Sequence, residues 1–109
     1  MLVGGKCHIG NDCMLSSGIT IWANDSHRLM DADTGELLND QPQGVLIGDH
    51  CWIGQGATFT KNAIIPANTV VGLQSVVTKS FREEFTALAG NPAKVIKKGV
   101  KWSREREMG

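Results

Sequence analysis

The sequence is poor in the features that mark membrane, secreted and nucleic-acid-binding proteins. Its 109 residues are 41% hydrophobic but contain no long apolar run, and Met1 leads directly into the repeat described below. We therefore expect one soluble, cytoplasmic domain with no membrane insertion and no signal peptide. Eleven Lys and Arg residues balance eleven Asp and Glu residues, so the formal net charge is zero. Without a basic excess to bind phosphates, we expect no nucleic-acid partner.

Cysteine is scarce as well, and its number is odd. The three cysteines are Cys7, Cys13 and Cys51, and none belongs to a CxxC pair. All three fall at the fifth position of a six-residue repeat, which predicts that they are small residues facing the core. This placement disfavours a disulfide framework and nucleophilic catalysis by cysteine, and it suits a reducing cytoplasm.

The dominant feature is a hydrophobic residue at every sixth position, in one unbroken phase. The ten residues are Val3, Ile9, Leu15, Ile21, Ile47, Ile53, Phe59, Ile65, Val71 and Val77. A period of six matches neither the 3.6-residue period of a helix nor a hairpin meander with turns every 8–12 residues. It predicts an all-β fold, a parallel β-helix that winds short strands around a narrow core.

The other positions of each hexad (six-residue repeat) support this prediction. The second position is usually Gly, Ser or Thr, and the fifth is usually compact, so each hexad points one large and one small residue inward. Gly, Asn or Asp before the fifth position allows the tight corner that needs a positive φ. Three hexads make one coil, with coils stacked about 4.8 Å apart. We count about four coils.

The repeat is interrupted between Ile21 and Ile47. We interpret the interval between these residues as one whole coil of three hexads plus an insertion of eight residues in the second coil. The segment is polar and has turn residues at Asp33-Thr34-Gly35 and before Pro42. It predicts a loop protruding over about residues 27–44, the kind of place where function is concentrated on a rigid scaffold. His27 stands at the start of this loop.

The residues around His27 resemble a known family. ITIWANDSH, TGELLN and VLIGDHCWIG are similar to the catalytic region of sugar and polysaccharide O-acetyltransferases of the hexapeptide-repeat family, and AGNPAKVIKK is similar to its closing motif. The resemblance implies a left-handed β-helix over residues 1–80, a capping segment over 81–109, and an acyltransferase that uses acetyl-CoA without a metal. It also implies that His27 is the general base. Imidazole, with an ordinary pKa near 6.5, can accept the proton of an attacking hydroxyl.

The same resemblance nominates cofactor-binding residues. Trp52 occupies a sixth hexad position, which predicts that its ring points outward, and the resemblance places it beside the acyl donor. The resemblance also places coenzyme A in a groove between subunits, near Leu73, Thr78, Lys79 and Lys97. Subunit packing would also explain an exposed Trp52, and solubility would explain either lysine. Leu73 and Gln74 replace a small pair of the family, which predicts a narrower groove. Family members also carry further coils before the point that corresponds to Met1.

The resemblance further implies a closed homotrimer. His27 would come from one subunit and part of the cofactor wall from its neighbour, with a small-molecule or saccharide hydroxyl as acceptor. At the C-terminus the repeat fades after Val77, and we expect residues 81–109 to cap the solenoid, with a charged helix or tail from Lys101 onward.

One alternative is disfavoured by the positions of the histidines, and two others remain open. A trimeric zinc enzyme of the γ-carbonic anhydrase type would use three histidines, but His8, His27 and His50 are widely spaced and fall in different hexad phases, so we expect no metal site. His8 and His50 should lie outward or at corners and be structurally neutral. The acceptor could instead be a xenobiotic such as an antibiotic hydroxyl. The chain could also be a degenerate trimeric scaffold without turnover.

Overall fold

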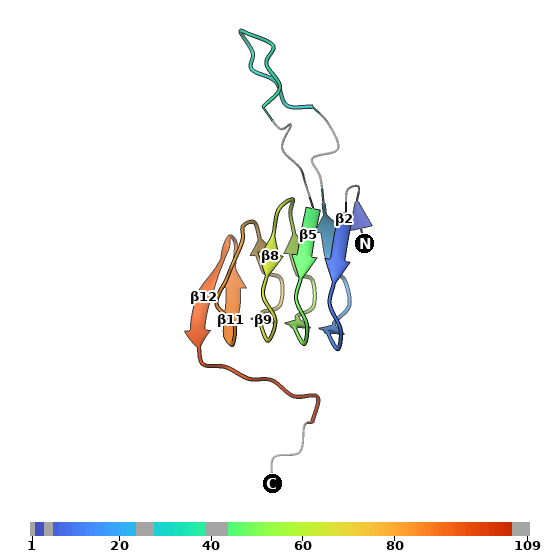
Figure 1. Ribbon diagram of the computed structural model, residues 1–109, viewed down its shortest axis with the longest axis vertical. Coiled ribbons are helices and arrows are strands. Elements are labelled where there is room, and N and C mark those ends of the chain that lie inside the picture. Colours follow the sequence, from blue (N-terminus) through green and yellow to red (C-terminus); the bar gives the residue numbers. More distant parts are fainter. Residues whose placement is uncertain (1, 4–5, 24–27, 39–43, 106–109) are drawn as a thin grey trace.

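The computed structural model describes residues 2–3, 6–23, 28–38 and 44–105, and its strands wind into a three-sided solenoid (Figure 1). The strands are β1 (Leu2–Val3), β2 (Lys6–Ile9), β3 (Met14–Leu15), β4 (Thr20–Trp22), β5 (Gly44–Ile47), β6 (Trp52–Ile53), β7 (Thr58–Phe59), β8 (Ile64–Ile65), β9 (Val70–Val71), β10 (Val76–Val77), β11 (Thr86–Gly90) and β12 (Ala93–Lys98). Three complete coils follow one another: coil 1 holds β2–β4, coil 2 holds β5–β7 and coil 3 holds β8–β10.

Each side of the solenoid is one sheet. Face A has the strand order β1-β4-β7-β10, face B has β2-β5-β8, and face C has β12-β11-β9-β6-β3. All pairs are parallel except β11 with β12, and Trp52 on β6 lies beside Val70 on β9, three hexads later in the chain. The predicted left-handed parallel β-helix with three hexads in each coil is therefore confirmed.

The inward phase of the repeat forms the core. Ile47, Ile53, Phe59, Ile65 and Val77 are fully buried, and the compact fifth positions alternate with them along the solenoid. Cys51 is fully buried, while Cys7 and Cys13 are half-buried and pack against the core, so all three cysteines point inward as expected. Coil 1 is the exception to complete burial, since Leu15 occupies an inward position and is still 46% exposed.

The corners explain the small second position. A Cβ added at Gly54 would lie 2.6 Å from the amide nitrogen of Leu73 in the next coil, so only glycine fits this approach. The fourth position adopts the left-handed region, with φ of 60° at Asp12, 50° at His50 and 57° at Asn68. Asn, Asp and His are the non-glycine residues that enter this region most readily. The predicted positive-φ corners are therefore present.

The predicted size of the insertion is wrong. Cys7 on β2 pairs with Val45 on β5, and Ile21 on β4 pairs with Phe59 on β7. The insertion therefore lies where coil 1 passes into coil 2. The corner residues Asp12 and His50, which occupy equivalent places in coils 1 and 2, have a sequence separation of 38. Since a coil without an insertion has three hexads, the insertion adds about 20 residues instead of eight. It follows β4 and precedes β5, at the edge between faces A and B.

The described part of this insertion, residues 28–38, is a small hairpin that projects beyond the solenoid (Figure 1). Met30 and Leu37 form an antiparallel bridge, and the amide of Asp31 donates to the carbonyl of Glu36 at 2.8 Å. The Asp31 carboxylate accepts the amides of Thr34 and Asp33, and these hydrogen bonds hold its pKa below the usual range. The turn is thus fixed by the Asp31 side chain.

The C-terminal segment covers one end of the solenoid and then turns back. On β11, Ala87 pairs with Val70 of β9, and β12 completes the edge as an antiparallel strand. Residues 99–105, which we call the strap, then run back across the coils. Of the helix or tail expected after Lys101, the described residues form an extended tail. The parts of the chain that the structure describes contain no helix long and apolar enough to cross a membrane.

Candidate functional site

Trp52 stands on the outer surface of face C. It follows the buried Cys51 on the six-residue repeat, and its side chain points away from the core and is 41% exposed. Its neighbours in register are Met14 on β3 and Val70 on β9. The expected outward orientation is confirmed, and the sheet alone leaves one side of the indole open.

Trp102 of the strap lies against that open side. The rings of Trp102 and Trp52 have centroids 6.1 Å apart and are tilted by 44°. Trp102 itself stacks on the imidazole of His50, at 4.2 Å and 12°, and its indole N–H donates to the carbonyl of His50 at 2.8 Å. His50 is therefore not structurally neutral as we expected, because Trp102 of the strap stacks on its ring and donates a hydrogen bond to its carbonyl.

Arg104 fastens the strap to coil 1. Its guanidinium donates to the Asp12 carboxylate at 2.7 Å and to the carbonyls of Asp12 and Cys13 at 3.3 and 3.2 Å. The other carboxylate oxygen of Asp12 lies 2.7 Å from Nδ1 of His50, and hydrogen bonds from His50 and Arg104 hold the pKa of Asp12 below its usual range, with the His50 hydrogen bond as the larger cause. The same guanidinium lies 5.1 Å from the centre of the Trp102 ring.

These contacts create a cleft on face C. Its volume is about 250 Å³, and it is lined by Met14, Trp52, Trp102, Ser103 and Arg104. Two indoles and a thioether make its walls apolar, while a hydroxyl and a guanidinium already bonded to Asp12 form the polar part. The cleft suits an uncharged group of a larger ligand that passes along face C.

The sequence did not single out Trp102 or Arg104. Both lie beyond the last hexad, in KGVKWSRER, where the repeat no longer says which way a side chain points. The available signal was an isolated tryptophan within a charged segment. An aromatic residue in such a place usually has a partner surface.

The other residues nominated for the cofactor lie around two sides of the solenoid. Lys97 is on β12 at the far edge of face C, three strands from Trp52. Leu73 is 72% exposed at the corner between faces C and A. Thr78 and Lys79 follow β10 and are exposed at the edge between faces A and B, where the ammonium of Lys79 lies 5.4 Å from the ring centre of Phe81.

His27 lies outside the described residues, so the structure gives no position for it. Its loop leaves the solenoid after β4 and returns at β5. This is the same edge, between faces A and B, that carries Thr78 and Lys79 further along the solenoid. In one chain the nominated residues thus fall into two groups, with the loop, Thr78 and Lys79 at this edge and Trp52 and Lys97 on face C, while Leu73 lies between them at the corner of faces C and A.

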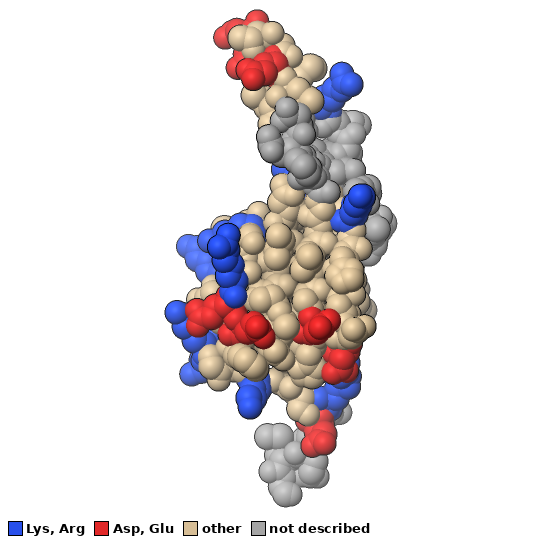
Figure 2. All heavy atoms as spheres, viewed as in Figure 1, with Lys and Arg blue, Asp and Glu red and all other residues tan. Residues whose placement is uncertain are grey.

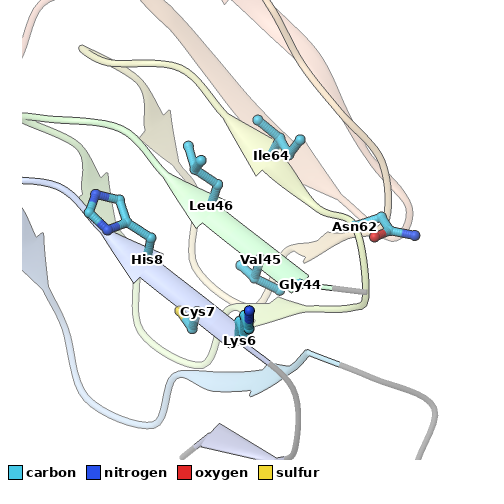
Figure 3. Close-up of a pocket in the computed structure, with 8 residues that line it drawn as sticks. All are labelled: Lys6, Cys7, His8, Gly44, Val45, Leu46, Asn62 and Ile64. Atoms are coloured by element: carbon cyan, nitrogen blue, oxygen red, sulfur yellow. The ribbon is translucent and has the colours of Figure 1, made fainter. Parts of the chain in front are cut away.

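Face B carries a separate apolar groove. His8, Leu46 and Ile64 point outward side by side from β2, β5 and β8, while Cys7 and Val45 point toward the core (Figure 3). The groove has a volume of about 680 Å³. Figure 2 shows that the middle of this face lacks charged side chains, whereas Lys and Arg gather along the β12 edge.

Two observations bear on other chemistries. Burial raises the pKa of the Cys51 thiol to about 11, so this thiol stays protonated and is a poor nucleophile at neutral pH. The described residues also contain no cluster of three or more His, Cys, Asp or Glu side chains arranged to hold a metal ion.

Comparisons with known proteins identify relatives of this chain. It is 42% identical over 101 residues to the polysialic acid O-acetyltransferase of Neisseria meningitidis, covering 93% of this chain and 46% of that protein. It is 32% identical over 105 residues to the polysialic acid O-acetyltransferase of Escherichia coli O1:K1 / APEC, covering 94% of this chain and 34% of that protein. No family model matches the chain.

A solved structure confirms the architecture. The polysialic acid O-acetyltransferase OatWY superposes with a TM-score of 0.89 at 39% sequence identity, over 97% of this chain and 50% of that one. The chain thus spans half or less of the length of these relatives. What it shares with OatWY is the solenoid together with its C-terminal cap.

Proposed function

Since the chain belongs to the hexapeptide-repeat acyltransferase family, with polysialic acid O-acetyltransferases among its relatives, we propose that it transfers acetyl from acetyl-CoA directly to an acceptor hydroxyl. The observation that carries this proposal is the identity of 42% along 93% of the chain to a polysialic acid O-acetyltransferase. The reducing environment suited to three free cysteines favours action in the cytoplasm.

In this proposal His27 is the general base. It removes the proton of the acceptor hydroxyl while the oxygen attacks the thioester carbonyl, and the tetrahedral intermediate then collapses and expels the thiolate of coenzyme A. The reaction needs no covalent enzyme intermediate. A positioned base of this kind contributes about 10²–10⁴-fold in rate.

The donor would be bound by five residues, Trp52, Leu73, Thr78, Lys79 and Lys97. Lys79 and Lys97 are exposed, as point charges for phosphate groups must be, and Lys98 beside Lys97 is partly neutralised by Glu83 at 3.3 Å. The cleft beside Trp52 would receive an apolar part of the donor near its thioester. The exposed Leu73 would then narrow the path between this cleft and face A.

The two groups of nominated residues support a shared site in a homotrimer. In one chain the His27 loop and Trp52 belong to different sides of the solenoid. In a trimer with a three-fold axis, the loop edge of one subunit would lie against face C of the next subunit. Apolar surfaces without a partner in the described chain also favour assembly. They are the groove on face B and the exposed hairpin side chains Met30, Leu37 and Leu38.

Size-exclusion chromatography with light scattering tests the assembly. One chain is 11.8 kDa, and a trimer is therefore expected at roughly three times that mass. A monodisperse monomer that retains full acetyl transfer would overturn the shared site.

The acceptor would be a saccharide, in line with the two relatives that are polysialic acid O-acetyltransferases. The decisive experiment offers acetyl-CoA with sialic acid oligomers, neutral sugars and antibiotic hydroxyls, and follows the free thiol that each transfer releases. We expect release only with saccharides, and release with antibiotics alone would favour the xenobiotic alternative.

The role of His27 is tested by His27→Ala, with Arg82→Ala as the control because Arg82 is exposed and lies outside the face B groove and the proposed donor site. We expect His27→Ala to lower kcat by at least about 100-fold with an unchanged oligomeric mass. Transfer that persists in His27→Ala would refute this base. If the wild type neither transfers acetyl nor gains thermal stability with acetyl-CoA, the degenerate scaffold is correct.

A further inference from the structure

The strap does more than cover a surface, because it is fixed at three defined points along the solenoid. The amide of Val100 donates to the carbonyl of Phe85 at 2.8 Å, Trp102 is held by His50 of coil 2, and Arg104 by Asp12 of coil 1. Phe85, His50 and Asp12 all occupy left-handed corner positions. The strap therefore follows one corner of the solenoid from β11 to coil 1.

This attachment determines the orientation of Trp102. One contact is the stacked imidazole of His50, a second is the hydrogen bond from the indole N–H, and a third is the Arg104 guanidinium near the ring. Rotating the indole away from this position would break all three contacts. A ring held in this way is a rigid wall for whatever lies beside it.

What lies beside it is Trp52. The two rings meet at 6.1 Å and 44°, and no other strap residue is in ring contact with Trp52 in the described chain. Removing Trp102 would leave Trp52 with only Met14 and Val70 of its own sheet as neighbours in register. Trp102 also forms one wall of the cleft that opens next to Trp52.

We propose that Trp102 and Arg104 are positioning residues of the acyl-donor site: Arg104 fixes the strap, and Trp102 holds the Trp52 indole and shapes the cleft. This inference rests on the proposed function, in which Trp52 contacts the donor. It predicts that the strap affects the use of acetyl-CoA and leaves the affinity for the acceptor unchanged.

A spectroscopic test reports the position of Trp52 without requiring turnover. The chain has three tryptophans, so labelling with 5-fluorotryptophan gives three fluorine signals, which single Trp→Phe variants assign. We expect the Trp52 signal to shift and broaden in Trp102→Ala and in Arg104→Gln. It should stay unchanged in Arg82→Gln, a matched change at an exposed arginine outside the strap. An unchanged Trp52 signal in Trp102→Ala would overturn the proposal.

Kinetics on the full chain provide the second readout. We expect Trp102→Ala to lower kcat/KM for acetyl-CoA roughly tenfold while the KM for the acceptor changes less than twofold, and Trp102→Phe to restore most of the loss. A loss that disappears when rates are compared at equal folded fraction would mean that the strap only stabilises the fold, and it would overturn the proposal. If the wild type transfers no acetyl, the proposed function fails, whereas wild-type transfer with unaffected variants refutes only this inference.

Discussion

Coil 1 and coil 3 follow the same six-residue pattern, yet they bury it to different degrees. In coil 3 the inward residues Ile65, Val71 and Val77 are at most 1% exposed, whereas in coil 1 Ile9 is half-buried and Leu15 is 46% exposed. Coil 3 has coil 2 on one side and β11 on the other, whereas among the described residues coil 1 has only the short β1 beyond its face A. The position of a residue in the hexad therefore determines whether its side chain points inward, and the neighbouring coils determine how deeply that side chain is buried.

The largest expected effect comes from truncating the same repeat position in the two coils. Ile65→Ala should lower the free energy of unfolding by about 3 kcal/mol, because it empties a fully enclosed space in the core. Leu15→Ala should cost less than about 1 kcal/mol, because nearly half of that side chain is already in solvent. Urea unfolding at equal chain concentration measures both. Equal losses would show that coil 1 is as enclosed as coil 3.

The cysteines allow the same comparison by chemistry. Cys7 and Cys13 of coil 1 should be alkylated by iodoacetamide at pH 8 at least about tenfold faster than Cys51 of coil 2, because reaction requires exposure of the thiolate. Burial raises the pKa of Cys51 from 9.0 to about 11. The protonated Cys51 thiol thus contributes fully to the free energy of unfolding below about pH 9, and this contribution is lost as the pH rises toward about 11. Timed alkylation with peptide mass spectrometry measures the rates, and uniform labelling would contradict the comparison.

A smaller effect is expected from two buried hydroxyls of coil 3. The hydroxyl of Ser75 has no hydrogen-bond partner among the described residues, whereas that of Thr69 donates to the carbonyl of Pro66 at 2.9 Å. Ser75→Ala should raise the free energy of unfolding by up to about 1 kcal/mol, and Thr69→Val should lower it by about 1 kcal/mol. Thermal unfolding separates the two signs. A loss of stability in Ser75→Ala would mean that a partner for this hydroxyl exists in solution.

The smallest expected effect is the acid sensitivity of the strap on coil 1. The pKa of Asp12 lies below its usual value of 3.8, so its contribution is fully present above about pH 4 and is lost as the pH falls further. The protection factors of the Cys13 and Met14 amides, which correct for the intrinsic pH dependence of exchange, should therefore fall below about pH 4 in the wild type. In Asp12→Asn they should be lowered at every pH, while the protection of coil 3 is the control. A wild-type profile without this acid step would show that Asp12 does not hold the strap.

The sequence predicted the fold through positions that are equivalent in every coil. It identified the inward residues, the glycines at close approaches and the left-handed corners, because each depends only on the nearest coils. It misjudged the insertion because two arrangements of the interval from Ile21 to Ile47 leave both residues pointing inward. One is a whole coil of three hexads with a short insertion, and the other is a single hexad with a long insertion. It missed Trp102 and Arg104 because their partners His50 and Asp12 are 52 and 92 residues away.

The strap has a consequence for the order in which the protein is made. Coils of a solenoid contact only their neighbours, so a growing chain can stack each coil as it leaves the ribosome. Arg104 nevertheless joins Asp12 across 92 residues, so coil 1 receives this contact only after the chain has been synthesised as far as Arg104. Until then its partly exposed core is covered by β1 and β5–β7 without the strap, and nascent chains shortened before Trp102 should be more sensitive to proteases in coil 1 than in coil 2.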